Sequence, residues 1–190
     1  PWPADYGGVV DLFYKIKSLH QSGVKIHLHC FVDKRPPQDE LKKYCVAVYY
    51  YKRKNNLAHF SFRLPFIVSS RKDDELLKNL SRDNHPILLE GIHCSYYLHA
   101  GKLINRIVLL RLHNAEFEYY RNLALHEKNP LKKFYYRHES KLLKKYEHNL
   151  AKKVKILAVS EQDVQLYRKA FNSNDIEHLP FFLPYTIADF

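Results

Sequence analysis

Residues 106–116 read RIVLLRLHNAE, and this stretch decides the fold class of the chain. The segment 106–112 is rich in apolar residues and has the length of a strand, and a helical pattern over 115–126 follows it directly. A buried strand that leads at once into a helix is the repeating unit of α/β proteins. The same unit is therefore expected on both sides of this stretch.

Strand signals and helical patterns do alternate along the rest of the chain. Apolar residues from Val9 to Leu19 recur at helical spacing, and Gly23 supplies a stop. Strands are predicted over 24–31, 46–51, 87–90 and 155–159, with a weaker signal over 176–181. Further helices are predicted over 62–81, 130–153 and 161–171. This alternation predicts an α/β fold: a Rossmann-like, doubly wound, mostly parallel sheet in a single domain.

Length and charge limit the domain count and the kinds of partner. A chain of 190 residues is long enough for one domain with a sizeable core and short for two. The formal net charge of +11 favours an anionic partner, which could be nucleic acid, a lipid surface or a phosphorylated substrate. Charge alone does not choose among the three.

The cysteines and the hydropathy pattern indicate a cytoplasmic protein. Cys30, Cys45 and Cys94 have no metal-site spacing with the twelve histidines and are expected to be reduced thiols. No apolar run is long enough to span a membrane, and no secretion leader opens the chain. Because the chain starts at Pro1 and has no methionine, it is expected to be a processed or engineered piece.

The predicted helix over 130–153 is amphipathic and basic. Its predicted apolar side is made of Leu131, Tyr135, Leu142, Tyr146 and Leu150, while lysines occupy much of the remaining surface. The favoured interpretation is a helix that covers the core and turns a solvated lysine face outward. The alternative is peripheral contact with an anionic membrane through residues 130–155, at the inner membrane face.

Two segments are candidates for a ligand site. In an open parallel sheet, ligands bind beyond the carboxyl ends of the strands, so the residues that follow each strand matter most. The Pro-rich segment 1–8 ends in Gly7 and Gly8 directly before a predicted helix. Glycines there would let a phosphate or a sugar oxygen approach the backbone, although an ordinary tight turn has the same signature.

The second candidate segment follows the apolar run that ends at Leu110. Arg111, His113, Asn114 and Glu116 crowd the end of this strand. An Asn114 cap and an acidic Glu116 in the first helical turn would explain two of them structurally, which leaves Arg111 and His113 as site candidates. A histidine at a strand end can also be a structural residue.

Glu90 ends the preceding strand in the same way, where it could bind a ligand, orient another side chain or simply lie in the loop. The scattered histidines lack a supporting set of acidic or thiol ligands, so no metal ion is expected. The chain also lacks the Gly-x-Ser-x-Gly elbow of serine hydrolases and the phosphate-binding loop of nucleoside triphosphatases.

The order of these segments resembles a known family. The segment from Pro1 to Gly8, the helix and strand that follow, the stretch from Arg111 to Glu116 and the segment from Ile156 to Glu161 together resemble the N-terminal domain of retaining GT-B glycosyltransferases. These are the family-four class, which includes bacterial mannosyl- and galactosyltransferases. The resemblance covers nearly the whole chain and rests on the order and spacing of the segments.

The resemblance implies a function and roles for several residues. It implies transfer of a sugar, with retention at the anomeric carbon, from a nucleotide-sugar donor to a sugar or lipid-linked sugar acceptor in cell-surface polysaccharide biosynthesis. His113 matches a histidine that approaches the transferred sugar, and Gly7 and Gly8 match a loop near the donor phosphates and the acceptor. Asn114 and Glu116 match more loosely, and Arg111 and Glu90 would line the site. No cofactor beyond the donor substrate is implied.

The resemblance also implies that part of the enzyme lies outside this chain. Residues 1–180 would form the acceptor-side domain and residues 181–190 would begin the interdomain linker, while the donor-binding domain is absent. This piece alone is therefore expected to be inactive. In the family an apolar strand precedes the Pro-rich loop, and here Pro1 already lies in that loop.

Two other interpretations stay open. The first is a non-catalytic Rossmann-like module that binds nucleic acid or acidic lipid through its basic surface, for which the segment 49–54, YYYKRK, makes a crude match. Nucleic acid is disfavoured, because the same tyrosines also fit a buried strand. The second is a GT-B-like epimerase or phosphorylase, which this half of the fold does not distinguish from a transferase.

Overall fold

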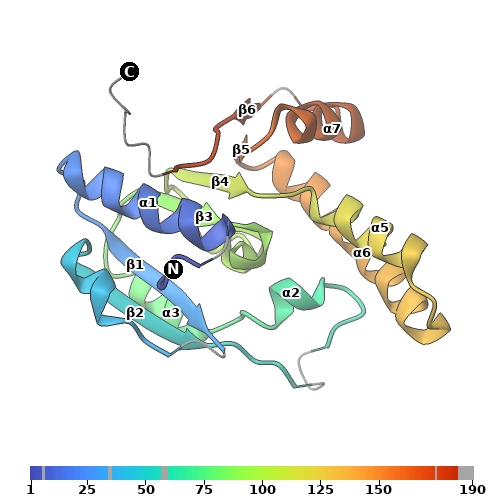
Figure 1. Ribbon diagram of the computed structural model, residues 1–190, viewed down its shortest axis with the longest axis horizontal. Helices are drawn as coiled ribbons and strands as arrows, with labels where there is room; N and C mark the ends of the chain where they lie inside the picture. The colour runs from blue at the N-terminus through green and yellow to red at the C-terminus, as the bar shows by residue number, and fades with distance from the viewer. Residues whose placement is uncertain (6, 34–35, 57–59, 174, 184–190) are drawn as a thin grey trace. The chain divides into compact units, whose positions relative to one another are not determined.

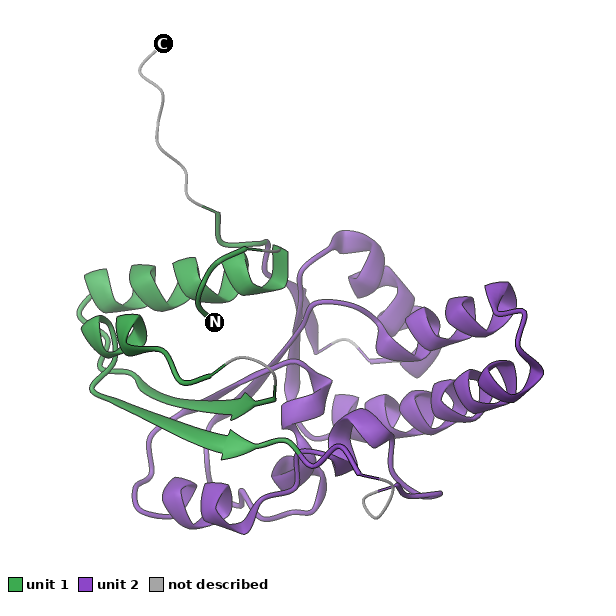
Figure 2. Cartoon of the chain, turned by 60° about the horizontal axis from the view of Figure 1, so that its bottom comes forward, with its two compact units in different colours: residues 1–53, 181–190 green, residues 54–180 purple. Residues whose placement is uncertain are grey.

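The computed structural model of the chain describes residues 1–5, 7–33, 36–56, 60–173 and 175–183. The chain forms two compact units, which Figure 2 distinguishes by colour. Unit 1 consists of Pro1–Arg53 together with Phe181–Phe190, and unit 2 consists of Lys54–Pro180. Each unit has its own parallel sheet.

Unit 1 is built from a helix and a two-stranded parallel sheet. Its elements are α1 (Gly7–Gln21), β1 (His27–Val32), the 3-10 helix η1 (Asp39–Lys43) and β2 (Ala47–Lys52). Strand β1 runs parallel to β2, with His27 opposite Ala47. Helix α1 ends because Gly23 adopts a φ of +79°, which lets its N–H bond to the carbonyl of His20 at 2.9 Å.

Unit 2 is built around a four-stranded parallel sheet with the order β3-β4-β5-β6. Its strands are β3 (Ile87–Glu90), β4 (Val108–Leu112), β5 (Lys155–Ala158) and β6 (Ile176–His178). The central strands are apolar because helices cover the sheet, and the most deeply buried strand residues include Leu110, Ile156 and Ile176.

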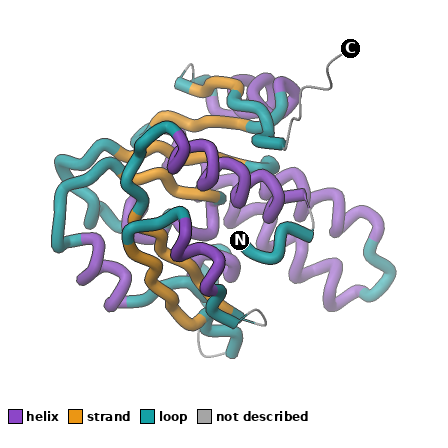
Figure 3. Tube along the Cα trace, turned by 60° about the vertical axis from the view of Figure 1, so that its left-hand side comes forward, coloured by secondary structure: helices purple, strands orange, loops and turns teal. Residues whose placement is uncertain are grey.

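Unit 2 has two helices before β3, and its other helices connect the strands of the sheet (Figure 1). They are α2 (Phe66–Ser69), α3 (Asp74–Leu80), the 3-10 helix η3 (Ile92–Cys94), α4 (Tyr96–His99), α5 (Glu116–His126), α6 (Pro130–Ala151) and α7 (Glu161–Phe171). Helices α5 and α6 form an antiparallel hairpin between β4 and β5, which Figure 3 shows as paired helical tubes. Among the described residues, no helix has both the length and the apolar composition needed to cross a bilayer.

The prediction of an α/β, Rossmann-like fold with parallel strands is confirmed. The predicted strands all exist, although β1 and β4 begin two or three residues later than expected. The proposed division at residue 180 stays a prediction, and residues 184–190 of the expected linker lie outside the described residues. Within unit 1, the backbone N–H of Phe182 donates to Asp11 Oδ1 at 2.7 Å.

The single helix predicted over 62–81 is wrong. The structure has two short helices there, α2 and α3, separated by a turn. Pro65 precedes α2, where its missing N–H costs nothing, and the Asp73 side chain accepts hydrogen bonds from the N–H groups of Glu75 and Leu76 at the start of α3. The local capping residues therefore overrode the apolar periodicity.

The predicted apolar side of α6 is only partly correct. Tyr146 and Leu150 are buried as expected, but Leu131 is 81% exposed. Two acidic residues that the prediction did not include, Glu139 and Glu147, are fully buried on this helix. Both carboxyl groups accept hydrogen bonds from backbone N–H groups at the starts of other helices, which offsets the free-energy cost of burying them.

Candidate functional site

The candidate site lies at the carboxyl ends of β3 and β4 in unit 2. The two strands run parallel, and their register places Glu90 opposite Arg111. Gly91 then turns the chain away from the sheet with a φ of +87°, and its N–H bonds to the carbonyl of Arg111 at 2.8 Å. The last residues of both strands are thereby fixed beside one another.

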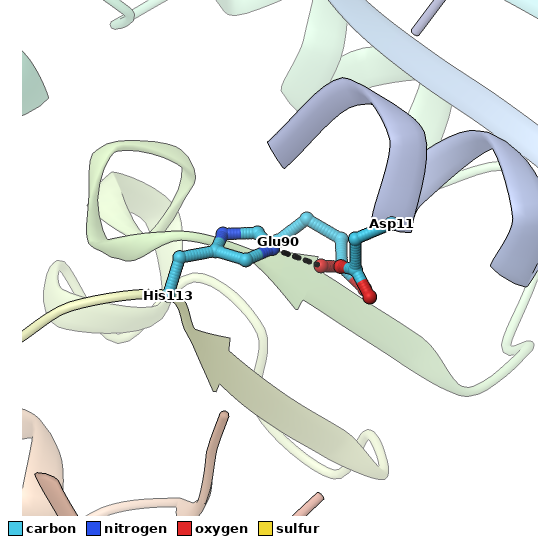
Figure 4. A group of neighbouring side chains, drawn as sticks. All are labelled: Asp11, Glu90 and His113. Carbon is cyan, nitrogen blue, oxygen red and sulfur yellow. Dashed lines mark ion pairs between the residues drawn. The ribbon is translucent and has the colours of Figure 1, made fainter. Parts of the chain in front are cut away.

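Glu90, Arg111 and His113 form a charged cluster at this edge. Arg111 is fully buried, and its Nη1 lies 3.7 Å from Glu90 Oε2 and 3.4 Å from His113 Nε2. His113 Nε2 lies 3.8 Å from the same carboxylate oxygen, as the dashed line in Figure 4 marks. The histidine and glutamate side chains keep 23% and 16% of their surface exposed, so a ligand could reach them.

Arg111 also ties the cluster to the chain that follows β6. Its Nη2 donates to the carbonyl oxygens of Leu179, at 3.4 Å, and Pro180, at 2.9 Å. A buried guanidinium needs such acceptors because its charge is desolvated. The side chain therefore joins the ends of three strands and limits the positions that His113 can adopt.

Asn114 does not cap α5, contrary to the prediction. The residue at the N-cap position is Ala115, and Glu147 from α6 serves the helix instead by accepting from the N–H of Phe117 at 2.9 Å. The exposed Asn114 side chain hydrogen-bonds to Glu116. The helix start is thus stabilised by a tertiary contact, which the local sequence does not reveal.

Glu116 and Arg71 extend the site along the start of α5. Burial raises the pKa of Glu116 above its ordinary value, and the hydrogen bond from Asn114 and the nearby His113 and Arg71 side chains oppose this increase. Arg71, in the turn after α2, was not predicted from the sequence. A single arginine in a charged turn gives no signal that could have identified it.

Gly7 and Gly8 belong to unit 1, whereas the other predicted site residues belong to unit 2. The helix α1 begins at Gly7, so the two glycines form its first turn and do not precede it. A Cβ atom at Gly7 would meet nothing within 4 Å. Further along α1, the buried Asp11 carboxylate lies 3.5 Å from Lys15 Nζ.

Comparison with known proteins gives one informative relative. Over 151 residues the chain is 30% identical to an uncharacterized 44.6 kDa protein in the cps region of Klebsiella pneumoniae. The match covers 73% of this chain and 37% of that protein, so the chain spans little more than a third of its relative. No protein family matches the chain, and neither does any solved structure.

Proposed function

We propose that this chain is the acceptor-side half of a glycosyltransferase that moves a sugar from a nucleotide-sugar donor to an acceptor hydroxyl in polysaccharide biosynthesis. The observation that supports it best is the cluster of Glu90, Arg111 and His113 at the carboxyl edge of a parallel sheet. Open α/β sheets bind their ligands at this edge. The partly exposed imidazole there is a suitable partner for a sugar hydroxyl.

The contact between Arg111 and His113 would favour one tautomer of the imidazole. A guanidinium only donates, so the contact between Arg111 and His113 is a hydrogen bond when Nε2 is unprotonated. The imidazole proton is then on Nδ1, which would donate to the transferred sugar. Arg111 has no exposed surface, so it acts on the ligand through His113 and is a positioning residue.

The proposed reaction breaks the bond between the anomeric carbon and the diphosphate and forms a bond from that carbon to the acceptor oxygen. The acceptor proton passes to the departing diphosphate. Positioning of the two substrates and electrostatic support of the leaving group would supply most of the rate enhancement. The site is proposed to need no metal ion or other cofactor.

The relative in Klebsiella pneumoniae supports the biological setting. Its name places it in a cps region, which points to capsular polysaccharide biosynthesis. At 44.6 kDa it is about twice the 22.7 kDa of this chain, which leaves room for a second domain of similar size. A donor-binding domain in the complete protein would occupy that part, and this chain alone would then be inactive.

The test compares the complete protein with two histidine variants. Release of nucleoside diphosphate is followed with a panel of nucleotide sugars and acceptors for wild type, His113→Ala and His126→Ala. His126 is the exposed last residue of α5 and serves as the matched control. We expect one donor to be turned over, His113→Ala to lower turnover by more than about tenfold, and His126→Ala to leave it unchanged.

Two results would contradict the proposal. Equal turnover by wild type and His113→Ala would remove His113 from the mechanism. No release from any donor by a folded wild-type protein would refute the transferase itself and favour a non-catalytic binding module.

A further inference from the structure

The outward surface of α6 combines large apolar side chains with basic ones. Leu131, Phe134, His138, Lys141 and Lys145 recur at intervals of three and four residues and lie on the face opposite the buried residues. We call this set the outer stripe. Its first half is apolar and its second half is basic, so one surface offers both kinds of contact.

The charges exposed on α6 have a single sign. All residues of this helix are described, and its only acidic residues are Glu139 and Glu147. Both are fully buried, Glu139 accepting from the N–H of Phe66 at 2.8 Å and Glu147 from that of Phe117 at 2.9 Å. The exposed basic residues are Lys132, Arg137, Lys141, Lys144 and Lys145, with Lys133 half-buried. No acidic side chain on this helix therefore neutralises them.

Large apolar side chains lie beside this charge with most of their surface in solvent. Leu131 is 81% exposed and Phe134 is 74% exposed. Phe62, 77% exposed, packs against His138 with ring centroids 5.9 Å apart, which brings a third apolar side chain to the stripe. Leu131 and Phe134 lie in the first turns of α6, next to the short loop that joins it to α5. This end of the hairpin projects away from the strands of unit 2 (Figure 1).

We propose that the outer stripe, with Phe62, docks unit 2 on an anionic lipid bilayer. Leu131, Phe134 and Phe62 would enter the boundary between headgroups and acyl chains, and the lysines would contact lipid phosphates. A shallow hollow on the same helix, lined by Lys141, Lys144, Lys145, His148 and Asn149, gives a phosphate group a basic surface to approach.

The apolar residues favour lipid over nucleic acid as the partner. A protein that binds the phosphate backbone of a duplex gains affinity from its lysines. Bases of a single strand can stack on phenylalanine, but neither kind of nucleic acid gains from an exposed leucine such as Leu131. An amphipathic helix at a membrane surface requires both, with leucine and phenylalanine inserted and lysines at the headgroups. The side of the hairpin formed by α5 carries Glu118 and is less suited to an anionic surface.

The experiment measures cosedimentation of the complete protein with vesicles of phosphatidylcholine alone or with about a third phosphatidylglycerol. The variants are Leu131→Asp/Phe134→Asp, Lys141→Gln/Lys145→Gln and the control Ile104→Asp, which changes a 73% exposed isoleucine in the loop before β4. Wild type and Ile104→Asp should bind the anionic vesicles only. Each double variant should bind at least about tenfold more weakly, and NaCl at about 0.5 M should release the wild type.

Several results would overturn the proposal. These are no binding of wild type to anionic vesicles, equal binding by the Leu131→Asp/Phe134→Asp variant, or a matching loss in Ile104→Asp. In one such case the wild type does not bind vesicles and the Leu131→Asp/Phe134→Asp variant melts at a lower temperature than the wild type. That pair of results would show that another part of the protein covers the stripe. The assay does not depend on sugar transfer, so its failure leaves the proposed function standing.

Discussion

Replacing Glu147 by glutamine should remove much of the pH dependence of stability. Glu147 is fully buried on α6, where its Oε1 accepts from the N–H of Phe117 at 2.9 Å and its Oε2 hydrogen-bonds with the hydroxyl of Tyr167. Burial raises the pKa of Glu147 from 4.5 to about 8, although both hydrogen bonds oppose the increase. The carboxyl group is therefore mainly protonated in the folded protein at neutral pH.

The direction of the effect follows from proton linkage. Between pH 4.5 and about 8 the folded state binds a proton at Glu147 that the unfolded state releases, so the free energy of unfolding falls as the pH rises. Raising a pKa from 4.5 to about 8 corresponds to about 5 kcal/mol at roughly 1.4 kcal/mol per pKa unit. The contribution is fully present below pH 4.5 and is lost by the time the pH passes about 8.

Glutamine should imitate the protonated acid. Its carbonyl can accept from the N–H of Phe117, and its amide can donate to the Tyr167 oxygen, while the side chain has no proton to lose. From about pH 5 to about pH 8, the melting temperature of wild type should fall by on the order of 10 °C more than that of Glu147→Gln. Circular dichroism of the unfolding transition measures this difference.

The control is Glu118→Gln on α5, which removes a glutamate that forms an ion pair with Arg121 near the surface. It should leave the pH dependence of the wild type intact. If Glu147→Gln and wild type lost stability in parallel over this pH range, the buried carboxyl group would already be ionised, and the reasoning would be wrong.

The remaining predictions concern two local features of unit 2. Gly91→Ala should destabilise the fold by roughly 1–3 kcal/mol, because a φ of +87° suits glycine and a Cβ there would clash with the His93 ring. Denaturant unfolding that matches wild type would contradict this. Asn129→Ala should cost about 1 kcal/mol, because the Asn129 side chain accepts from the N–H groups of Leu131 and Lys132 at the start of α6, whereas Asn129→Asp should retain the cap; equal melting temperatures for the alanine and aspartate variants would refute the capping role.

The sequence was most informative where the ends of an element are encoded locally. Helix α7 occupies the predicted residues 161–171 because Ser160 accepts from the N–H of Asp163 at one end and Asn172 turns with a φ of +49° at the other. Strand β3 also matches its prediction, since a polar residue and a glycine follow its apolar run. The prediction over 62–81 failed because its apolar spacing continues across two helix starts, at Pro65 before α2 and at Asp73 before α3.

The candidate site was predictable to the extent that parallel strands align. Glu90 and Arg111 lie at the ends of the neighbouring strands β3 and β4, and His113 directly follows β4, so their proximity follows from the sheet register. The contribution of Glu147 was not predictable, because a glutamate among lysines has the pattern of an exposed helix face. Its burial depends on the start of α5 being close enough to supply a donor, which only the packed structure reveals.

Helix α6 connects the two proposals physically. On its inner face, the Glu147 side chain accepts a hydrogen bond from the N–H of Phe117 and forms another with the Tyr167 hydroxyl. The same hydroxyl lies 3.5 Å from the carbonyl oxygen of Asn114, to which it can donate. These contacts fix the segment that directly follows His113. The opposite face of the same helix presents the outer stripe. Docking of that stripe on a bilayer would hold the His113 cluster at a set distance from the lipid surface, an arrangement that favours a lipid-linked acceptor over a freely diffusing one.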